Sequence, residues 1–203
     1  MIPRIEQKLE INKSDYPSVL QWMHKKNAKF LYPERLICSI YFDNFNKDMY
    51  YQTVEGITPR KKIRIRTYNT RDFLYTKSNY NLEKKLTTEH SRYKEVKENI
   101  NPNIYIQDGI FDNLYGICLP QIEISYFREY YEIDNHRITI DKEINYKSIN
   151  SELIYKEDSF VLEIKANINK DSDYISNLFD FPRTKFSKYE RGIDRINNKL
   201  NNY

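Results

Sequence analysis

The chain has 203 residues, the size of one typical domain, so we expect a single domain over residues 1–203. Its composition is 39% hydrophobic and 15% aromatic, which supplies enough apolar side chains for a core and excludes intrinsic disorder despite 31% charged residues. The net charge of +4 comes from 33 basic and 29 acidic residues, and this balance excludes a histone-like nucleic-acid binder.

Several kinds of active site are excluded by what the sequence lacks. It contains four glycines, none of them spaced as in a phosphate-binding loop, so Walker and Rossmann nucleotide sites are excluded. Cys38 and Cys118 stand singly in apolar segments without a CxxC partner, which predicts buried, inert thiols rather than a zinc site or a disulfide. The three histidines are scattered, so histidine-based metal or triad chemistry is not expected.

Targeting and membrane segments are also not expected. The first residues alternate charged and apolar side chains, unlike the apolar stretch of a signal peptide. No window reaches the roughly 18 uninterrupted apolar residues of a membrane-spanning helix. We therefore expect a soluble, cytoplasmic protein.

Strands are predicted wherever apolar and polar side chains alternate with a period of two. In chain order, the alternating or apolar segments cover residues 4–11, 36–42, 61–68, two pieces within 73–86, 91–96, 121–132, 137–144 and 160–166. The segment 36–42 is almost continuously apolar, as in a strand that is buried on both faces. About eight regularly spaced strands predict an α+β fold whose antiparallel sheet closes as a β-barrel.

Amphipathic helices are predicted to cover the apolar surface of this sheet. Ser14 and Asp15 are expected to cap the first helix, and Ser187 with Glu190 has the spacing of a capping box at the start of the last. The predicted helices cover residues 15–27, 103–115, 171–180 and about 188–201.

Basic residues occupy the polar positions of most of the predicted strands. One such strand is more often simply a solvated face, but the repetition favours a shared role. If the barrel turns its apolar face outward under the helices, these side chains line the interior, where they repel one another unless a dense anion binds there. They are Lys8, Arg64, Arg66, Lys85, Arg92, Lys94, Arg128, Arg137 and Lys165.

Carboxylates share the same alternation. Each can either neutralise neighbouring lysines and arginines or hold Mg²⁺ or Mn²⁺ through hard oxygen ligands, and both interpretations stay open. A linear polyanion that arrives with a metal ion suits such an interior, whereas the interior of a closed barrel does not admit the bases of a nucleic acid. The carboxylates are Glu6, Glu10, Glu83, Asp141 and Glu163.

The order of these pairs resembles the vacuolar transporter chaperone (VTC) domain, the polyphosphate polymerase branch of the triphosphate tunnel metalloenzymes. The similarity runs from residue 4 to about residue 195, and its most specific parts are LEIKAN and KFSKYERG, the latter at 185–192. The motifs that carry it are Glu6-x-Lys8, Arg64-x-Arg66, Glu83-x-Lys85, Tyr126-x-Arg128, Arg137-x-Thr139-x-Asp141 and Glu163-x-Lys165. The resemblance implies a tunnel barrel that transfers the γ-phosphate of ATP onto inorganic polyphosphate with Mn²⁺ or Mg²⁺.

The resemblance also implies roles for single residues. Glu163 corresponds to the metal-binding glutamate of the family, with Glu6 as a second candidate ligand. Ser187 matches a position near the bound phosphates, although a helix cap explains it equally well. Arg92 and Lys94 share one face, and which of them matches the family's basic residue stays open. The expected phosphate-binding residues are Lys8, Arg64, Arg66, Lys85, Arg128, Arg137, Lys165, Lys185 and Lys188, and the first six of these are expected to grip the triphosphate during catalysis.

Two departures from the wider family qualify the expected activity. The first strand reads ExKxE, whereas the adenylate cyclase and thiamine triphosphatase (CYTH) branch has ExExK, which favours the polymerase over a hydrolase of small triphosphates. No membrane domain is expected, so export of polymer would need a separate partner at the inner face of a membrane. The alternatives are a metal-dependent triphosphatase, polyphosphatase or nucleoside triphosphatase, and a polyphosphate-binding module without turnover. Oligomeric state and the preferred metal are not predicted.

Overall fold

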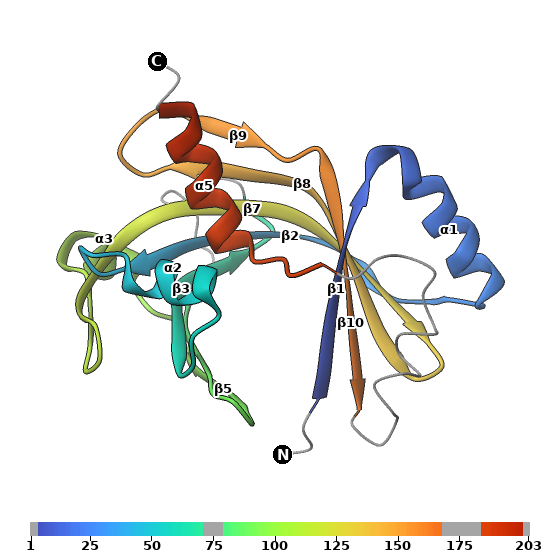
Figure 1. Ribbon diagram of the computed structural model, residues 1–203, viewed down its shortest axis with the longest axis horizontal. Coiled ribbons are helices and arrows are strands. Elements are labelled where there is room, and N and C mark those ends of the chain that lie inside the picture. The colour runs from blue at the N-terminus through green and yellow to red at the C-terminus, as the bar shows by residue number, and fades with distance from the viewer. Residues whose placement is uncertain (1–3, 71–78, 168–183, 201–203) are drawn as a thin grey trace. The chain divides into compact units, whose positions relative to one another are not determined.

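The computed structural model of the chain describes residues 4–70, 79–167 and 184–200 (Figure 1). It divides into two compact units that interleave along the sequence. The first unit comprises Met1–Arg35, Tyr126–Ile144 and Glu157–Phe186, and the second comprises Leu36–Ser125, Asn145–Lys156 and Ser187–Tyr203.

The elements of the first unit are β1 (Arg4–Asn12), a short 3-10 helix (Lys13–Asp15), α1 (Tyr16–Lys25) and β10 (Ser159–Asn167). The second unit contains α2 (Asp48–Glu55), β3 (Arg60–Tyr68), β4 (Asn81–Thr87), β5 (Arg92–Lys97), α3 (Pro102–Asp108), β6 (Ile110–Asp112), β9 (Ile154–Lys156) and α5 (Lys188–Leu200). Three long strands contribute residues to both units, namely β2 (Lys29–Asp43), β7 (Gly116–Ile133) and β8 (His136–Ser148).

The sheet follows the order β1-β10-β8-β7-β2-β3-β4-β5, with β6 paired to β7 and β9 to β8. The pairs β1–β10, β10–β8, β2–β3, β3–β4 and β4–β5 are antiparallel. This confirms the predicted α+β class with an antiparallel sheet. The path ends at β1 and β5, and no ladder joins these strands within the described ranges, so closure into a barrel is not shown.

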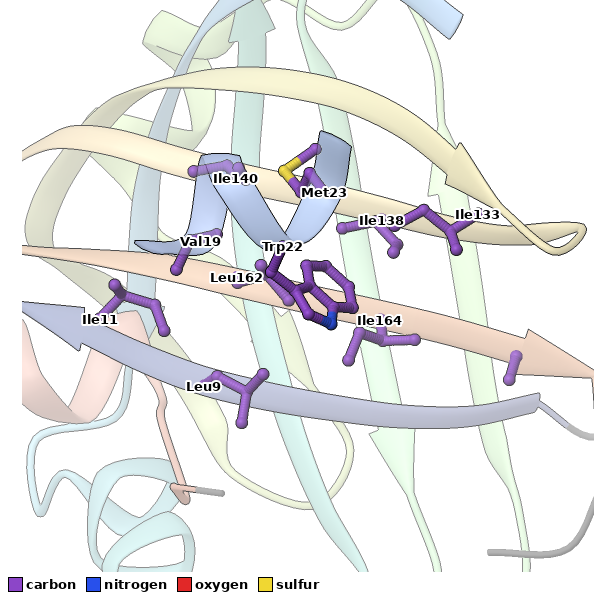
Figure 2. Packing of buried hydrophobic residues seen from close by; sticks show 11 residues of the cluster. Leu9, Ile11, Val19, Trp22, Met23, Ile133, Ile138, Ile140, Leu162 and Ile164 are labelled. Atoms are coloured by element: carbon purple, nitrogen blue, oxygen red, sulfur yellow. The ribbon is translucent and has the colours of Figure 1, made fainter. Parts of the chain in front are cut away.

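The core of the first unit lies on one face of β1, β10 and β8. Period-two alternation places Leu9 opposite Leu162, and Leu162 opposite Ile140, so that these side chains share that face. Helix α1 covers it with Trp22 and Met23, together with Val19 one turn earlier (Figure 2). The alternation of apolar and polar residues that predicted these strands therefore also creates the apolar surface that α1 covers.

In the second unit, one face of β3 and β4 is apolar, with Ile63, Ile65 and Leu82 buried. Helix α5 passes close to β7 and β8 because it carries Gly192. A Cβ at this position would lie 2.7 Å from the ring of Tyr146 and 2.8 Å from Ile122. Any larger residue would therefore push α5 away from these strands.

Helix predictions were only partly correct. The helix expected over residues 103–115 is wrong, because α3 ends at Asp108 and residues 110–112 form β6, which pairs with β7. Gly109 causes the change: its φ of +79° ends the helix, and its backbone approaches Cys118 and Ile117 so closely that a Cβ would clash at 2.9 Å. This close approach sets the β6–β7 hairpin beside the end of α3.

The remaining local expectations had mixed outcomes. Asp15 lies at the N-cap of α1 but its side chain makes no capping hydrogen bond, and Ser14 bonds to Asp15 instead. The last helix begins as expected, with the Ser187 hydroxyl accepting from the backbone N–H of Glu190 at 3.3 Å. Helix α2 and strand β9 were not predicted. The strand at 73–76 and the helix at 171–180 lie outside the described residues.

The two cysteines are buried and free, as expected. Burial raises the pKa of the Cys38 thiol far above its usual value and that of Cys118 to about 11, so both are protonated and unreactive at neutral pH. None of the described helices combines the length and apolar character required to span a membrane.

The packing of α1 predicts which of its apolar residues stabilise the first unit. Replacing Met23, which is 4% exposed, with Ala should lower the free energy of unfolding by about 2–5 kcal/mol. The matched control is Leu20→Ala, because Leu20 lies in the same helix but is 43% exposed; it should cost no more than about 0.5 kcal/mol. Urea unfolding followed by the fluorescence of Trp22, the only tryptophan, measures both. Equal losses would contradict the packing.

Candidate functional site

The first unit carries a charged face on the side of the sheet opposite α1. In register, Lys8 of β1 lies opposite Glu163 of β10, and Glu163 lies opposite Thr139 of β8. Two residues farther along β10 and on the same face, Lys165 lies opposite Glu6 of β1 and opposite Arg137 of β8. Residues that pair directly across antiparallel strands share a face, so the sheet itself gathers these side chains.

Arg128 of β7 joins this charged face through a bidentate ion pair. Its Nε and Nη2 donate to the two carboxylate oxygens of Asp141 at 2.5 and 2.7 Å. Nη2 also lies 3.7 Å from Oε2 of Glu163, and the guanidinium lies 5.3 Å from the ring centre of Tyr126. Asp141 thus fixes the Arg128 guanidinium in one orientation, with one edge directed at Glu163.

Glu163 is the most enclosed carboxylate among those implied to bind metal, at 5% exposed. Burial alone would raise its pKa, but Arg128, Lys8 and Lys165 together hold the pKa well below its usual value, so Glu163 is ionised at neutral pH. The ammonium of Lys165 lies 3.0 Å from Oε1. Lys8 donates to the backbone carbonyl of Phe186 at 3.2 Å and lies 3.9 Å from Oε1 of Glu6.

The carboxylates of the charged face differ in whether their oxygens are already engaged by neighbouring side chains. Both oxygens of Asp141 are engaged by Arg128, and Glu10 accepts a hydrogen bond from Ser159 at 2.9 Å. Glu6 and Glu163 are therefore the carboxylates of this face best suited to a cation. No cluster of three or more potential ligands occurs in the part of the chain that the structure describes.

A pair of carboxylates still fits Mg²⁺ or Mn²⁺. Magnesium in phosphate-processing sites commonly takes one or two carboxylates and completes its shell with phosphate oxygens and water. The Oε1 atom of Glu163 is buried and has no hydrogen-bond partner, and the ammonium of Lys165 lies 3.0 Å from it, a place beside this oxygen that a cation already occupies. Glu6 lies near enough to Glu163 to influence its pKa. The donor set thus matches a cation that is held partly by its substrate.

The second unit carries a more strongly basic face. In register, Lys62 of β3 lies opposite Lys85 of β4, and Lys85 lies opposite Lys94 of β5. The adjacent row pairs Arg64 with Glu83, and Arg66 lies two residues beyond Arg64 on the same face. Basic side chains thus lie directly opposite one another across neighbouring strands, an arrangement that destabilises a sheet unless an anion offsets it.

Glu83 supplies part of that compensation. It is 3% exposed, and its carboxylate accepts from Arg64 Nε at 2.7 Å and from Lys94 Nζ at 2.6 Å. Arg66 Nη1 lies farther away, at 3.9 Å. Burial would raise the pKa of Glu83, but Arg64, Arg66 and Lys94 outweigh it and lower the pKa to about 2. One ionised carboxylate therefore orients the basic side chains around it.

Tyrosines hold Arg64 from its other side. Arg64 Nη1 donates to the hydroxyl of Tyr41 at 2.8 Å, and the Tyr41 ring stacks on Tyr189 with 5.3 Å between ring centres. Tyr189 in turn donates to Asp43 at 2.7 Å. Burial would raise the pKa of Tyr41, but Arg64, Arg66 and Lys188 lower it. Arg64 is thus clamped between a carboxylate and a phenol.

Ser187 caps the last helix, as expected, and also contacts the basic face of the second unit. Its hydroxyl caps α5 at Glu190 and also accepts from Lys62 Nζ at 2.7 Å. The start of α5 therefore lies at the edge of the basic face, and Lys188 follows directly.

The structure thus sorts the predicted site residues into two groups. Glu6, Lys8, Arg128, Glu163 and Lys165 gather in the first unit. There, Arg137 is exposed at the margin of the charged face and Lys185 is exposed just before α5. Arg64, Arg66, Lys85, Lys94, Ser187 and Lys188 belong to the second unit. Their roles in binding stay predictions.

Three details go beyond the sequence prediction. Both Lys94 and Arg92 are exposed, but Lys94 contacts Glu83, whereas Arg92 lies one row farther along β5, opposite Thr87. Lys62 was not among the predicted site residues, although its alternation with Arg64 and Arg66 signalled it. Tyr41 was also missed, because it lies in a run of apolar and aromatic residues that gave no hint of a polar face.

The pKa of Glu83 predicts how acid affects stability. A folded pKa of about 2, below the usual 4.5, means that Glu83 stabilises the fold above pH 4.5 and loses this contribution as the pH falls toward 2. Glu83→Gln should lower the free energy of unfolding at pH 7 by about 1.5–3 kcal/mol and flatten its decline in acid. Urea unfolding at several pH values measures this. The control is Glu95→Gln, an exposed β5 residue opposite Lys84; matching acid profiles for the two variants would contradict the assignment.

Comparison with known proteins identifies the family. The sequence matches the VTC domain over residues 3–116 and 114–197, which together make up most of the chain. No curated protein matches it in sequence.

Solved structures share the fold at low sequence identity. The protein PH1819 from Pyrococcus horikoshii OT3 superimposes with a TM-score of 0.57 at 15% identity, over 94% of this chain and 99% of that one. HpAC1 from Hippeastrum, a proposed adenylyl cyclase with a dominant triphosphatase activity, gives a TM-score of 0.53 at 15% identity, over 92% and 93% of the two chains. The chain belongs to the VTC domain family and shares its fold with these two proteins.

Proposed function

We propose that the protein is a polyphosphate polymerase that transfers the γ-phosphate of ATP onto a growing inorganic polyphosphate chain. The observation that carries this proposal is the basic face of the second unit, where Arg64 and Lys94 contact the carboxylate of Glu83 and Lys62, Lys85 and Lys94 lie opposite one another across three strands. A repeating polyanion offers the closely spaced negative charges that such a face lacks. Membership of the VTC domain family supports the same substrate class.

The basic face would act by positioning and by neutralising charge. Phosphoryl transfer requires an in-line arrangement and stabilised oxygens more than covalent participation of the protein. Arg64 is fixed by Glu83 and Tyr41, so its guanidinium loses little freedom when phosphate binds. Lys85 and Lys94 extend the basic surface along the strands.

The charged face of the first unit would hold the metal and the reacting phosphates. Glu163 and Glu6 would bind Mg²⁺ or Mn²⁺, and Arg128, oriented by Asp141, would contact phosphate oxygens together with Lys8 and Lys165. When bound, the divalent cation neutralises negative charge on the phosphate oxygens. The protein side chains keep the transferred group aligned.

The proposed reaction balances without a protein base. An ionised oxygen at the end of the polyphosphate chain forms a bond to the γ-phosphorus, and the bond from that phosphorus to the β–γ bridging oxygen breaks. The electron pair leaves on ADP, and the chain grows by one phosphate. Because the attacking oxygen carries no proton, no general base is required.

Hydrolysis is the second candidate. The same side chains would stabilise attack by water on tripolyphosphate, polyphosphate or a nucleoside triphosphate. The fold shared with HpAC1, which has a dominant triphosphatase activity, favours keeping this candidate. The proposal of a polymerase also includes two expectations: the protein is located in the cytoplasm, and a separate membrane protein exports the polymer.

Product analysis separates these activities. Purified protein is incubated with ATP and Mn²⁺, and long polyphosphate is resolved from free phosphate on a gel. We expect long polymer from the wild type and a loss of at least about 10²-fold with Glu163→Gln, because a group that holds charge in the transition state is removed. Free phosphate without polymer would assign hydrolysis, and the absence of both products would leave a binding module.

Binding of tripolyphosphate tests the basic face directly. Arg64→Ala combined with Arg66→Ala should weaken binding by about 10²-fold, because each arginine contributes charge-assisted hydrogen bonds. The loss should shrink as salt rises. Calorimetric titration at two salt concentrations measures it. The control is Lys97→Ala, an exposed β5 lysine opposite Leu82 and hence on the apolar side of the sheet. Unchanged affinity of the double variant would show that these arginines do not contact the ligand.

A further inference from the structure

Thr139 occupies the middle of the charged face of the first unit. It lies on β8 between Arg137 and Asp141, two residues from each, so all three side chains share one side of the strand. Its direct partner on β10 is Glu163. The register therefore places a hydroxyl opposite the carboxylate proposed to bind metal.

Both of these side chains bury an oxygen that accepts no hydrogen bond among the described residues. Thr139 is 3% exposed, and its Oγ1 has no hydrogen-bond partner among the described residues. Oε1 of Glu163 also accepts no hydrogen bond, although Lys165 Nζ lies 3.0 Å from it as an ion pair. An unsatisfied buried polar group costs on the order of 1–3 kcal/mol, and most such groups in folded proteins find a partner. The unsatisfied hydroxyl of Thr139, opposite the carboxylate of Glu163, is therefore placed to bind a ligand shared with that carboxylate.

The surroundings of Glu163 indicate which kind of ligand. Lys165 Nζ lies 3.0 Å from Oε1 without hydrogen-bond geometry, so a positive charge already stands beside this oxygen. Arg128 engages the other oxygen from 3.7 Å. A bare anion would be repelled by Glu163. A divalent cation would bind the carboxylate and the lone pairs of the Thr139 hydroxyl, and the phosphate chain that accompanies it would offset its repulsion by Lys165 and Arg128. Hydroxyl and carboxylate oxygens are hard ligands suited to Mg²⁺ and Mn²⁺.

We infer that the hydroxyl of Thr139 is a ligand of the divalent cation, together with the carboxylate of Glu163. The inference rests on the proposed metal site and adds a neutral oxygen from the adjacent strand. A threonine or serine hydroxyl plays this part toward Mg²⁺ in phosphate-binding loops. The hydroxyl sets the affinity for the cation, and its buried, unsatisfied state in the protein is the cost of that role.

The test measures cation binding rather than turnover. Mn²⁺ is titrated into the full chain, and the electron paramagnetic resonance signal of free Mn²⁺ gives the affinity, with and without imidotriphosphate as a non-hydrolysable phosphate chain. Thr139→Val removes the hydroxyl and keeps the shape of the side chain. It should weaken Mn²⁺ binding by about 10-fold or more, within the range seen when groups that support a metal are lost. Thr139→Ser keeps a hydroxyl and should bind Mn²⁺ with an affinity close to that of the wild type.

A second threonine supplies the matched control. Thr67 on β3 also buries an unsatisfied hydroxyl, but it belongs to the second unit and alternates with the basic residues, so it lies on the apolar face. Thr67→Val should leave Mn²⁺ affinity unchanged. Neither valine variant should lower the free energy of unfolding, since each removes an unsatisfied group.

The outcomes separate this inference from the proposed function. Wild-type affinity in Thr139→Val, with loss in Glu163→Gln, would overturn the role of Thr139 and keep the metal site. Loss in Thr139→Val with rescue by serine supports the inference even if ATP yields no polymer, which would count against the polymerase alone. A wild-type protein that binds no Mn²⁺ in either condition would overturn both.

Discussion

The organisation of this protein depends on how it tolerates positive charge on one side of a sheet. Lysines and arginines opposite one another on neighbouring strands repel, and the repulsion grows as water is excluded. Two buried carboxylates offset it locally: Glu83 orients Arg64 and Lys94, and Asp141 orients Arg128. Because each ion pair fixes a guanidinium or ammonium group in place, the compensation that permits folding also prepares the charged faces for an anionic ligand.

The two charged faces differ in composition, and the difference suggests different tasks. Around Glu83 the basic side chains far outnumber the carboxylates, as suits the grip on a polyanion. On the first unit, the carboxylates of Glu6 and Glu163 equal in number the lysines opposite them, Lys165 and Lys8, as suits a cation that arrives with phosphate. The buried hydroxyl of Thr139, which has no hydrogen-bond partner among the described residues, belongs to this second kind of surface.

Several features were readable in the sequence because they follow from strand periodicity. Alternation placed Arg64 and Arg66 on one side and Ile63 and Ile65 on the other, and burial of the isoleucines confirms that assignment. The start of the last helix was readable at Ser187, because a capping hydroxyl acts within a single turn. Other features were not local. Tyr41 appeared to be core because its polar contact, Arg64, lies on a different strand. Gly109 appeared to continue a helix, but its contact with the later strand β7 redirects the chain into a hairpin.

The sequence by itself determined the strand pattern, the segregation of charge from apolar residues, the family, and most of the residues that the resemblance implies in phosphate binding. These depend on side-chain order along single strands, which the chain carries explicitly. Only the tertiary structure showed which carboxylates form ion pairs with arginine. It also showed that Lys62 donates a hydrogen bond to Ser187 and that Thr139 lies opposite Glu163. Each of those depends on the register between strands distant in sequence. Register is set by packing of the buried faces, so a pattern within one strand does not contain it.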